Sequence, residues 1–174
     1  MNTQNGFSLL EMLIAVAIVA LVSVVFSQVF ITTLRTNTQT EIVKEVKQSG
    51  DVSMQTMVRM IQNAKTVTCP SSQSLSLVNP DGNTTVFRCN AAGTTMRLAS
   101  VSGSLTEYLT SDSVTLGGAV CTGSSIQFTC TVTPGLPTTV VISFSLAQSG
   151  VSGQQFEKAN ESFEQTAIMR NTPL

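Results

Sequence analysis

An uncharged, strongly apolar segment near the N-terminus is the feature that most limits how this chain can fold. From Met12 to Leu34 there is no charged residue, and Met12–Val22 is almost purely aliphatic. A helix of about 20 apolar residues is what the hydrocarbon core of a bilayer requires. The polar residues of the segment all lie after Val22, so its most apolar part is closer in length to a secretory signal. Length alone therefore leaves a membrane helix and a signal peptide both open.

The flanking residues disagree with an ordinary secretory signal. Such a signal begins with a basic region and ends at a small-residue cleavage site. Residues 1–6 contain no lysine or arginine, and the sequence around Val24–Gln28 offers only a poor cleavage site. No cysteine lies near the end of the segment, which excludes a lipoprotein. A plain membrane anchor, in turn, does not explain the charged residue Glu11 at the start of the helix.

A specific pattern surrounds this glutamate. Gly6 and Phe7 directly precede the apolar segment, and Glu11 lies four positions after Phe7. The segment Gly6–Ile18, GFSLLEMLIAVAI, resembles the prepilin cleavage and methylation motif of the type IV pilin-like family. This resemblance implies that a prepilin peptidase in the membrane removes residues 1–6 as a leader and methylates the new N-terminal residue, Phe7.

Glu11 can have two roles, and the two are compatible. A carboxylate beside hydrocarbon is costly and persists mainly where it has a partner. The resemblance implies that this partner is the amino group of Phe7 in a neighbouring subunit, which would neutralise both charges in a filament core and help set the stagger between subunits. Ser8 and Glu11 also have the spacing of a capping box, in which each side chain caps the other residue's amide. A negative charge there suits the positive end of the helix dipole.

The location of the chain also follows from the resemblance. It implies a single-pass protein of the inner membrane, with residues 7–34 in contact with lipid before they enter the filament core. Its partners would be other pilin or pseudopilin subunits and the inner-membrane assembly platform. Arg35, Lys44 and Lys47 follow the apolar segment, so the positive-inside rule favours the reverse orientation. The cysteines on the same side favour a C-terminal head outside the cytoplasm, and we give them more weight.

The next part of the chain predicts an amphipathic helix at 35–65. One stripe of apolar or small residues recurs there at spacings of three and four, as expected for one helix face. Its members are Val43, Val46, Gly50, Met54, Met57, Ile61 and Ala64. We therefore expect one helix from about Ser8 to about Lys65. Gly50 would either act as a hinge or let a strand approach the helix closely.

After Pro70 the apolar pattern changes to the alternation of β-strands, which predicts a β-rich head at 66–174. The segment Asn79–Asn83, NPDGN, is a strong turn between two such runs. The expected strands lie around residues 75–78, 85–87, 94–101, 113–116, 126–132, 138–146 and 163–170. The resulting fold class is α+β, with a long N-terminal helix packed on an antiparallel β-sheet head. The triplets at Asn83 and Asn160 have the form of N-glycosylation acceptors, a form that also arises often by chance.

Four cysteines lie in the C-terminal two-thirds: Cys69, Cys89, Cys121 and Cys130. None forms a Cys-x-x-Cys pair, so a zinc or redox site is weakly supported. An even number is typical of disulfides in an oxidising compartment, and four cysteines permit three pairings. We favour the sequence-local set, Cys69–Cys89 with Cys121–Cys130. Four buried free thiols are the alternative.

The sequence offers no catalytic constellation. It has no histidine, so the commonest general base and metal ligand is absent and a Ser-His or Cys-His pair cannot form. A Gly-rich phosphate loop is also missing. With a pI near 5.3 and no basic run, electrostatics does not point to nucleic acid. We therefore expect no enzyme activity, no cofactor and no metal.

The closing segment Phe163–Asn171 adds a finer resemblance. Its alternating strand capped by Arg-Asn is similar to the C-terminal segment of minor pilins and pseudopilins. The function implied is a structural subunit of a type IV pilus, a type II secretion filament or a competence-type filament. The alternative is a membrane-tethered binding or adhesin module that acts alone through its head.

Overall fold

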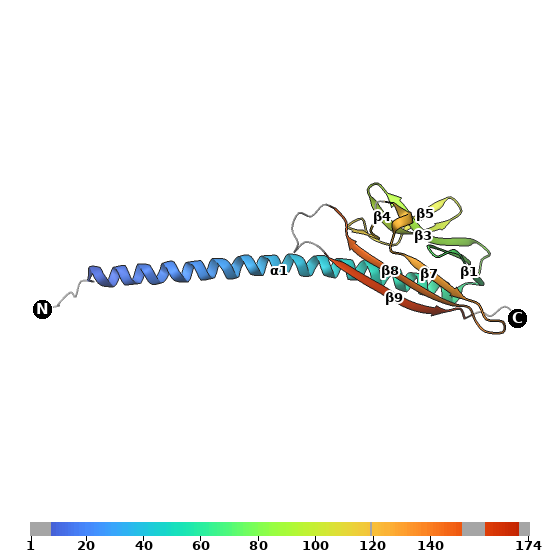
Figure 1. Ribbon diagram of the computed structural model, residues 1–174, viewed down its shortest axis with the longest axis horizontal. Coiled ribbons are helices and arrows are strands. Elements are labelled where there is room, and N and C mark those ends of the chain that lie inside the picture. The colour runs from blue at the N-terminus through green and yellow to red at the C-terminus, as the bar shows by residue number, and fades with distance from the viewer. Residues whose placement is uncertain (1–7, 119, 151–158, 171–174) are drawn as a thin grey trace. The chain divides into compact units, whose positions relative to one another are not determined.

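A computed structural model describes residues 8–118, 120–150 and 159–170. The chain divides into two compact units, Met1–Thr40 and Glu41–Leu174, and we call the second the globular unit. One helix and nine strands are described, with one short 3-10 turn (Figure 1). They are α1 (Leu9–Asn63), β1 (Thr66–Ser71), β2 (Ser74–Val78), β3 (Thr84–Ala92), β4 (Thr95–Ser102), β5 (Leu105–Tyr108), β6 (Val114–Thr115), η1 (Cys121–Gly123), β7 (Gln127–Thr131), β8 (Thr139–Gln148) and β9 (Asn160–Ile168).

The apolar stripe of α1 is the centre of the core, as its spacing predicts. Val46, Met54, Met57 and Ile61 are buried, together with Ala64 just after the helix. They form one cluster with the inward-facing residues of the strands, among them Leu75, Leu77, Phe87, Leu98, Val140, Ile142 and Leu146. The expected helix from about Ser8 to about Lys65 is confirmed, and so is the α+β class.

Gly50 lets a strand approach the helix. A Cβ built on this glycine would overlap the ring of Phe163 in β9, which stacks on Phe144 of β8 with 5.2 Å between ring centroids. Lys47 lies 3.5 Å from Glu161 of the same strand, so β9 follows this part of α1 closely. Of the two roles expected for Gly50, the structure supports close approach of a strand.

The strands form two antiparallel sheets, where the sequence predicts one. The first sheet has the order β1-β2-β3-β4-β5, and the second has β8 flanked by β9 on one side and by β6 and β7 on the other. The expected strands are present, but β1 and β5 were not predicted. β1 has one buried residue, Val67, and β5 has none, so neither strand shows the alternation that reveals a half-buried strand. β1 also contains Pro70, which a strand at the edge of a sheet tolerates.

Both disulfides join the first sheet to the part of the chain that builds the second. Cys69 of β1 is bonded to Cys130 of β7, and Cys89 of β3 to Cys121 of η1. The favoured sequence-local pairing is therefore wrong. Strand β2 lies between β1 and β3, which puts their Cα atoms about 9–10 Å apart. A disulfide needs Cα atoms within about 7 Å, and the two observed bridges span 5.8 and 5.4 Å.

Candidate assembly and processing segment

The helix begins with the cap that the sequence predicts. The amide of Glu11 donates a hydrogen bond of 3.2 Å to Oγ of Ser8, which satisfies one of the free amides of the first turn. Among the described residues, the reciprocal bond from the Ser8 amide to the Glu11 carboxylate is not formed. The capping box is thus half formed, and the carboxylate remains available to another partner. The predicted processing residues, Gly6 and Phe7, lie outside the described residues.

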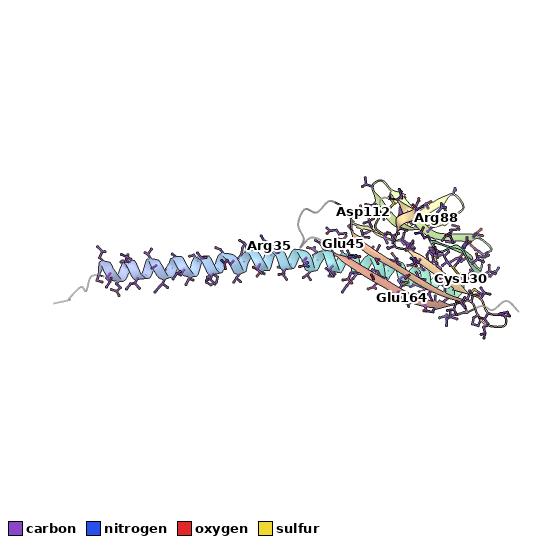
Figure 2. All side chains as sticks on the ribbon, viewed as in Figure 1. Arg35, Glu45, Arg88, Asp112, Cys130 and Glu164 are labelled. Atoms are coloured by element: carbon purple, nitrogen blue, oxygen red, sulfur yellow. A yellow bond between two sulfur atoms is a disulfide. The ribbon has the colours of Figure 1, made fainter. Side chains whose placement is uncertain are left out.

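The N-terminal part of α1 presents apolar surface around its whole circumference. Every residue from Ser8 to Asn37 is exposed, and the large apolar side chains between Leu9 and Leu34 are 45% to 83% accessible. Figure 2 shows these side chains projecting from all sides of the helix. Within the described residues, α1 is the one helix long and apolar enough to cross a membrane. An exposed apolar surface of this extent marks a site of contact with lipid or with other proteins.

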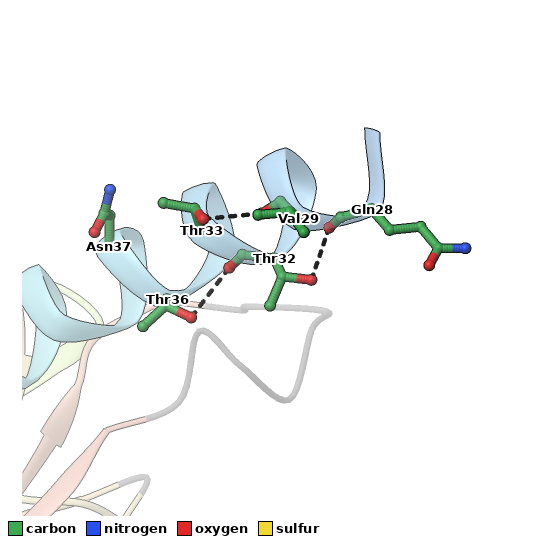
Figure 3. Close-up of a pocket in the computed structure, with 6 residues that line it drawn as sticks. All are labelled: Gln28, Val29, Thr32, Thr33, Thr36 and Asn37. Carbon is green, nitrogen blue, oxygen red and sulfur yellow. Dashed lines mark hydrogen bonds between the residues drawn. The ribbon is translucent and has the colours of Figure 1, made fainter. Parts of the chain in front are cut away.

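The serine and threonine residues inside this segment are compatible with a non-aqueous environment. Hydroxyl groups in its second half donate to backbone carbonyls one turn earlier, with oxygen–oxygen distances of 2.8 to 3.0 Å. Figure 3 shows three of these bonds, from Thr32, Thr33 and Thr36. Such local bonding satisfies a hydroxyl without water, as it does in membrane helices. The hydroxyls therefore do not interrupt the apolar segment as strongly as their positions in the sequence suggest.

Glu11 is the charged residue that this environment does not accommodate. Its side chain is flanked on the helix surface by apolar residues, including Leu10, Ile14 and Ile18. In the described part of the chain, no cation or hydrogen-bond donor reaches its carboxylate. A charged side chain in apolar surroundings is stable where a group of opposite charge neutralises it. The geometry fits a cation supplied from outside the described residues.

A row of polar residues on the part of α1 in the globular unit was not predicted from the sequence. Glu45, Ser49 and Ser53 lie at spacings of four on α1 and hydrogen bond to the segment that links the two sheets. Ser53 donates to the carbonyl of Leu109 at 2.8 Å, and Ser49 Oγ accepts from the amide of Ser111 at 3.2 Å. Glu45 accepts from the hydroxyl of Ser113. The regular spacing of these three residues beside the apolar stripe is the signal that would have revealed this contact.

The architecture and the N-terminal segment together define a class. A long N-terminal helix, apolar and exposed at its start, packs its later part on antiparallel β-sheets, which is the α+β arrangement of pilin-like subunits. The family model described as the prokaryotic N-terminal methylation motif matches residues 1–27. Residues 1–27 therefore carry the N-terminal motif of type IV pilin-like proteins, a motif that goes with processing by prepilin peptidase and assembly with other pilin subunits. No curated protein and no solved structure matches the chain.

Proposed function

We propose that this chain is a minor pilin or pseudopilin, a structural subunit of a type IV pilus, a type II secretion filament or a competence-type filament. The observation that carries the proposal is the exposed apolar helix with one carboxylate, Glu11, at its beginning. This carboxylate lies four positions after Phe7, the expected new N-terminus, and both residues are within the range that the methylation motif matches. These features support a structural role rather than catalysis.

Assembly would proceed by exchange of one apolar environment for another. The inner-membrane assembly platform would transfer residues 7–34 from the lipid of the inner membrane into the filament. There they pack against the same segments of neighbouring subunits. The methylated amino group of Phe7 in one subunit pairs with Glu11 of the next. Loss of one partner of a buried ion pair costs about 3–5 kcal/mol, because the other charge stays buried alone. This cost per contact is large enough to decide whether the subunit enters the filament.

The proposed topology places the globular unit outside the cytoplasm. Both bridges, Cys69–Cys130 and Cys89–Cys121, support this side of the membrane, because disulfides persist in oxidising compartments. The one candidate span in the described residues supports a single pass through the inner membrane. The C-terminal segment Phe163–Asn171 supports a minor subunit, by its likeness to the C-terminal segment of minor pilins and pseudopilins. Its residues 163–168 lie in β9, and Asn171 lies outside the described residues.

The test is the N-terminus and the fate of a Glu11→Ala variant in a host that contains prepilin peptidase. We expect protein recovered from membranes to begin at N-methylated Phe7, for wild type and variant alike. The variant should be processed yet recovered poorly in the filament fraction, whereas Glu41→Ala, an exposed carboxylate later on the same helix, should assemble normally. A start at Met1 or near Ser27 refutes the processing step. Normal assembly of Glu11→Ala would favour a tethered binding module instead.

A further inference from the structure

The structure distinguishes two N-glycosylation triplets that look alike in the sequence. Asn160 is the first residue of β9 and is paired with Ala147 of β8, and the next residue, Glu161, is held by Lys47. Asn83 lies outside the strands, at the end of the turn between β2 and β3, and its side chain is exposed. Acceptor asparagines are found in surface loops of exported proteins. Only Asn83 has that setting.

The turn presents the Asn83 carboxamide to solvent in a fixed way. The amide of Asn79 donates to the carbonyl of Asn83 at 2.8 Å, and Gly82 adopts φ of 88°, which favours glycine. One oxygen of Asp81 accepts from the Asn83 backbone amide at 3.0 Å, and the other from its Nδ2 at 2.8 Å. In the folded unit the carboxylate therefore holds the Asn83 side chain at the exposed tip of the turn.

The turn also lies where a glycan would disturb no packing. The amide of Lys65, directly after the end of α1, donates to the carbonyl of Val78 at 2.8 Å, so the turn is beside the C-terminal end of the helix. The turn residues from Asp81 to Thr84 are exposed. None of them belongs to the apolar core cluster. A sugar on Asn83 would extend from the tip of the hairpin into solvent.

We propose that Asn83 is an N-glycosylation site, modified by a membrane oligosaccharyltransferase with a polyprenyl-diphosphate-linked oligosaccharide as donor. The carboxamide nitrogen forms a bond to the anomeric carbon of the first sugar. The bond from that carbon to the diphosphate oxygen breaks, the polyprenyl diphosphate leaves with the electron pair, and the proton of the nitrogen passes to a base of the transferase. This proposal rests on the proposed location of the globular unit outside the cytoplasm.

The third residue of the triplet fixes when the transfer takes place. The hydroxyl of Thr85 is what makes the triplet an acceptor, yet Thr85 is 2% exposed in the folded unit. Its Oγ1 accepts a hydrogen bond of 2.8 Å from Nδ2 of Asn79. A transferase cannot reach this hydroxyl once the β2–β3 hairpin has closed. The transfer therefore precedes closure of the hairpin, while the chain is being exported.

The test is a tryptic digest of the full-length protein recovered from membranes of its own host. Cleavage after Lys65 and Arg88 gives peptide 66–88 with Asn83, and cleavage after Lys158 and Arg170 gives peptide 159–170 with Asn160 as an internal control. We expect a glycan mass on the first peptide, placed on Asn83 by fragmentation, and none on the second. An unmodified first peptide, or a sugar on Thr84 instead, overturns the proposal. The N-terminal peptide of the same digest shows separately whether Phe7 is methylated, so failure of one proposal is not mistaken for failure of the other.

Two variants and one comparison test the details. Thr85→Val should abolish the glycan and Thr85→Ser should restore it, because serine keeps the hydroxyl; retention in Thr85→Val overturns the site. Full-length protein from a host without the transferase is prepared in two forms, one folded and one reduced and unfolded in urea. Each form is diluted into transferase and lipid-linked donor. We expect modification of the unfolded form and none of the folded form. Equal modification of both overturns the order of events.

Discussion

The close contact between Gly50 and Phe163 predicts that the effect of Gly50→Ala on stability has opposite signs with and without the Phe163 ring. In the wild type a methyl group at position 50 overlaps the Phe163 ring, which is itself held by stacking on Phe144. In a Phe163→Ala background the ring is gone, and with it the three atoms nearest to such a methyl group. Gly50→Ala should therefore destabilise the wild type and stabilise the Phe163→Ala variant.

The magnitudes follow from two opposing effects. In a helix interior, alanine is favoured over glycine by about 0.8–1.0 kcal/mol. Overpacking a well-filled site by one methyl group costs about 1–3 kcal/mol. The sum for Gly50→Ala in the wild type is a loss of roughly 0–2 kcal/mol, from the same ranges. Without the ring only the helix term remains, a gain of about 1 kcal/mol, so the coupling energy equals the overpacking cost of about 1–3 kcal/mol.

The free energy of unfolding of the full-length protein in detergent would be measured for the four members of the cycle. Urea unfolding followed by the fluorescence of Tyr108 is suitable, because the chain has one tyrosine and no tryptophan. Asp51→Ala, at the exposed neighbouring position, is the control and should show no coupling to Phe163→Ala. Equal effects of Gly50→Ala in both backgrounds would refute the argument that Gly50 is needed for the approach of β9.

Three further predictions concern the globular unit. Replacing Cys69 and Cys130 together by alanine should lower the free energy of unfolding by about 4 kcal/mol on the chain-entropy account, because the bridge closes a separation of 61 residues; urea unfolding of oxidised protein checks this. Ile61→Ala should cost about 2–5 kcal/mol by the same assay, because Ile61 is fully buried in the core. The hydrogen bonds from the Asn83 amide and side chain lower the pKa of Asp81 below its ordinary value of 3.8. The contribution of Asp81 to stability is thus present above pH 3.8 and lost as the pH falls through its lower folded-state pKa, and NMR titration of Asn83→Ala should show this pKa rising.

The sequence predicts the helix and most strands because their residues are patterned by burial. The stripe from Val46 to Ile61 has helical spacing, and β8 alternates between buried and partly exposed residues along its length. Strand β5 lacks this signal, because all four of its residues are exposed. The division into two sheets was not visible either, since it depends on which strands pair and not on the pattern within any strand.

The disulfide pairing shows the same limit for a site defined by tertiary contacts. Cys69 and Cys89 are separated by one strand of their own sheet, and the order of strands alone rules out the bridge between them. Sequence distance favours that bridge, because short loops close at lower entropic cost. The packing of β1 beside β7 overrides this preference and brings Cys130 to Cys69. Pairing in such a fold is decided by sheet topology.

The methylation motif could be recognised from the sequence for the opposite reason, since a motif of consecutive residues does not depend on tertiary contacts. Its hydroxyls are satisfied by the helix itself, and its amide at Glu11 by Ser8. Two features still need a suitable environment: the apolar surface from Leu9 to Ile31, and the Glu11 carboxylate, which no described residue neutralises. Lipid satisfies the first requirement but not the second, whereas a bundle of identical helices, each with a positively charged N-terminus, satisfies both. The proposed filament is therefore the environment in which both the apolar surface and the Glu11 carboxylate have a partner.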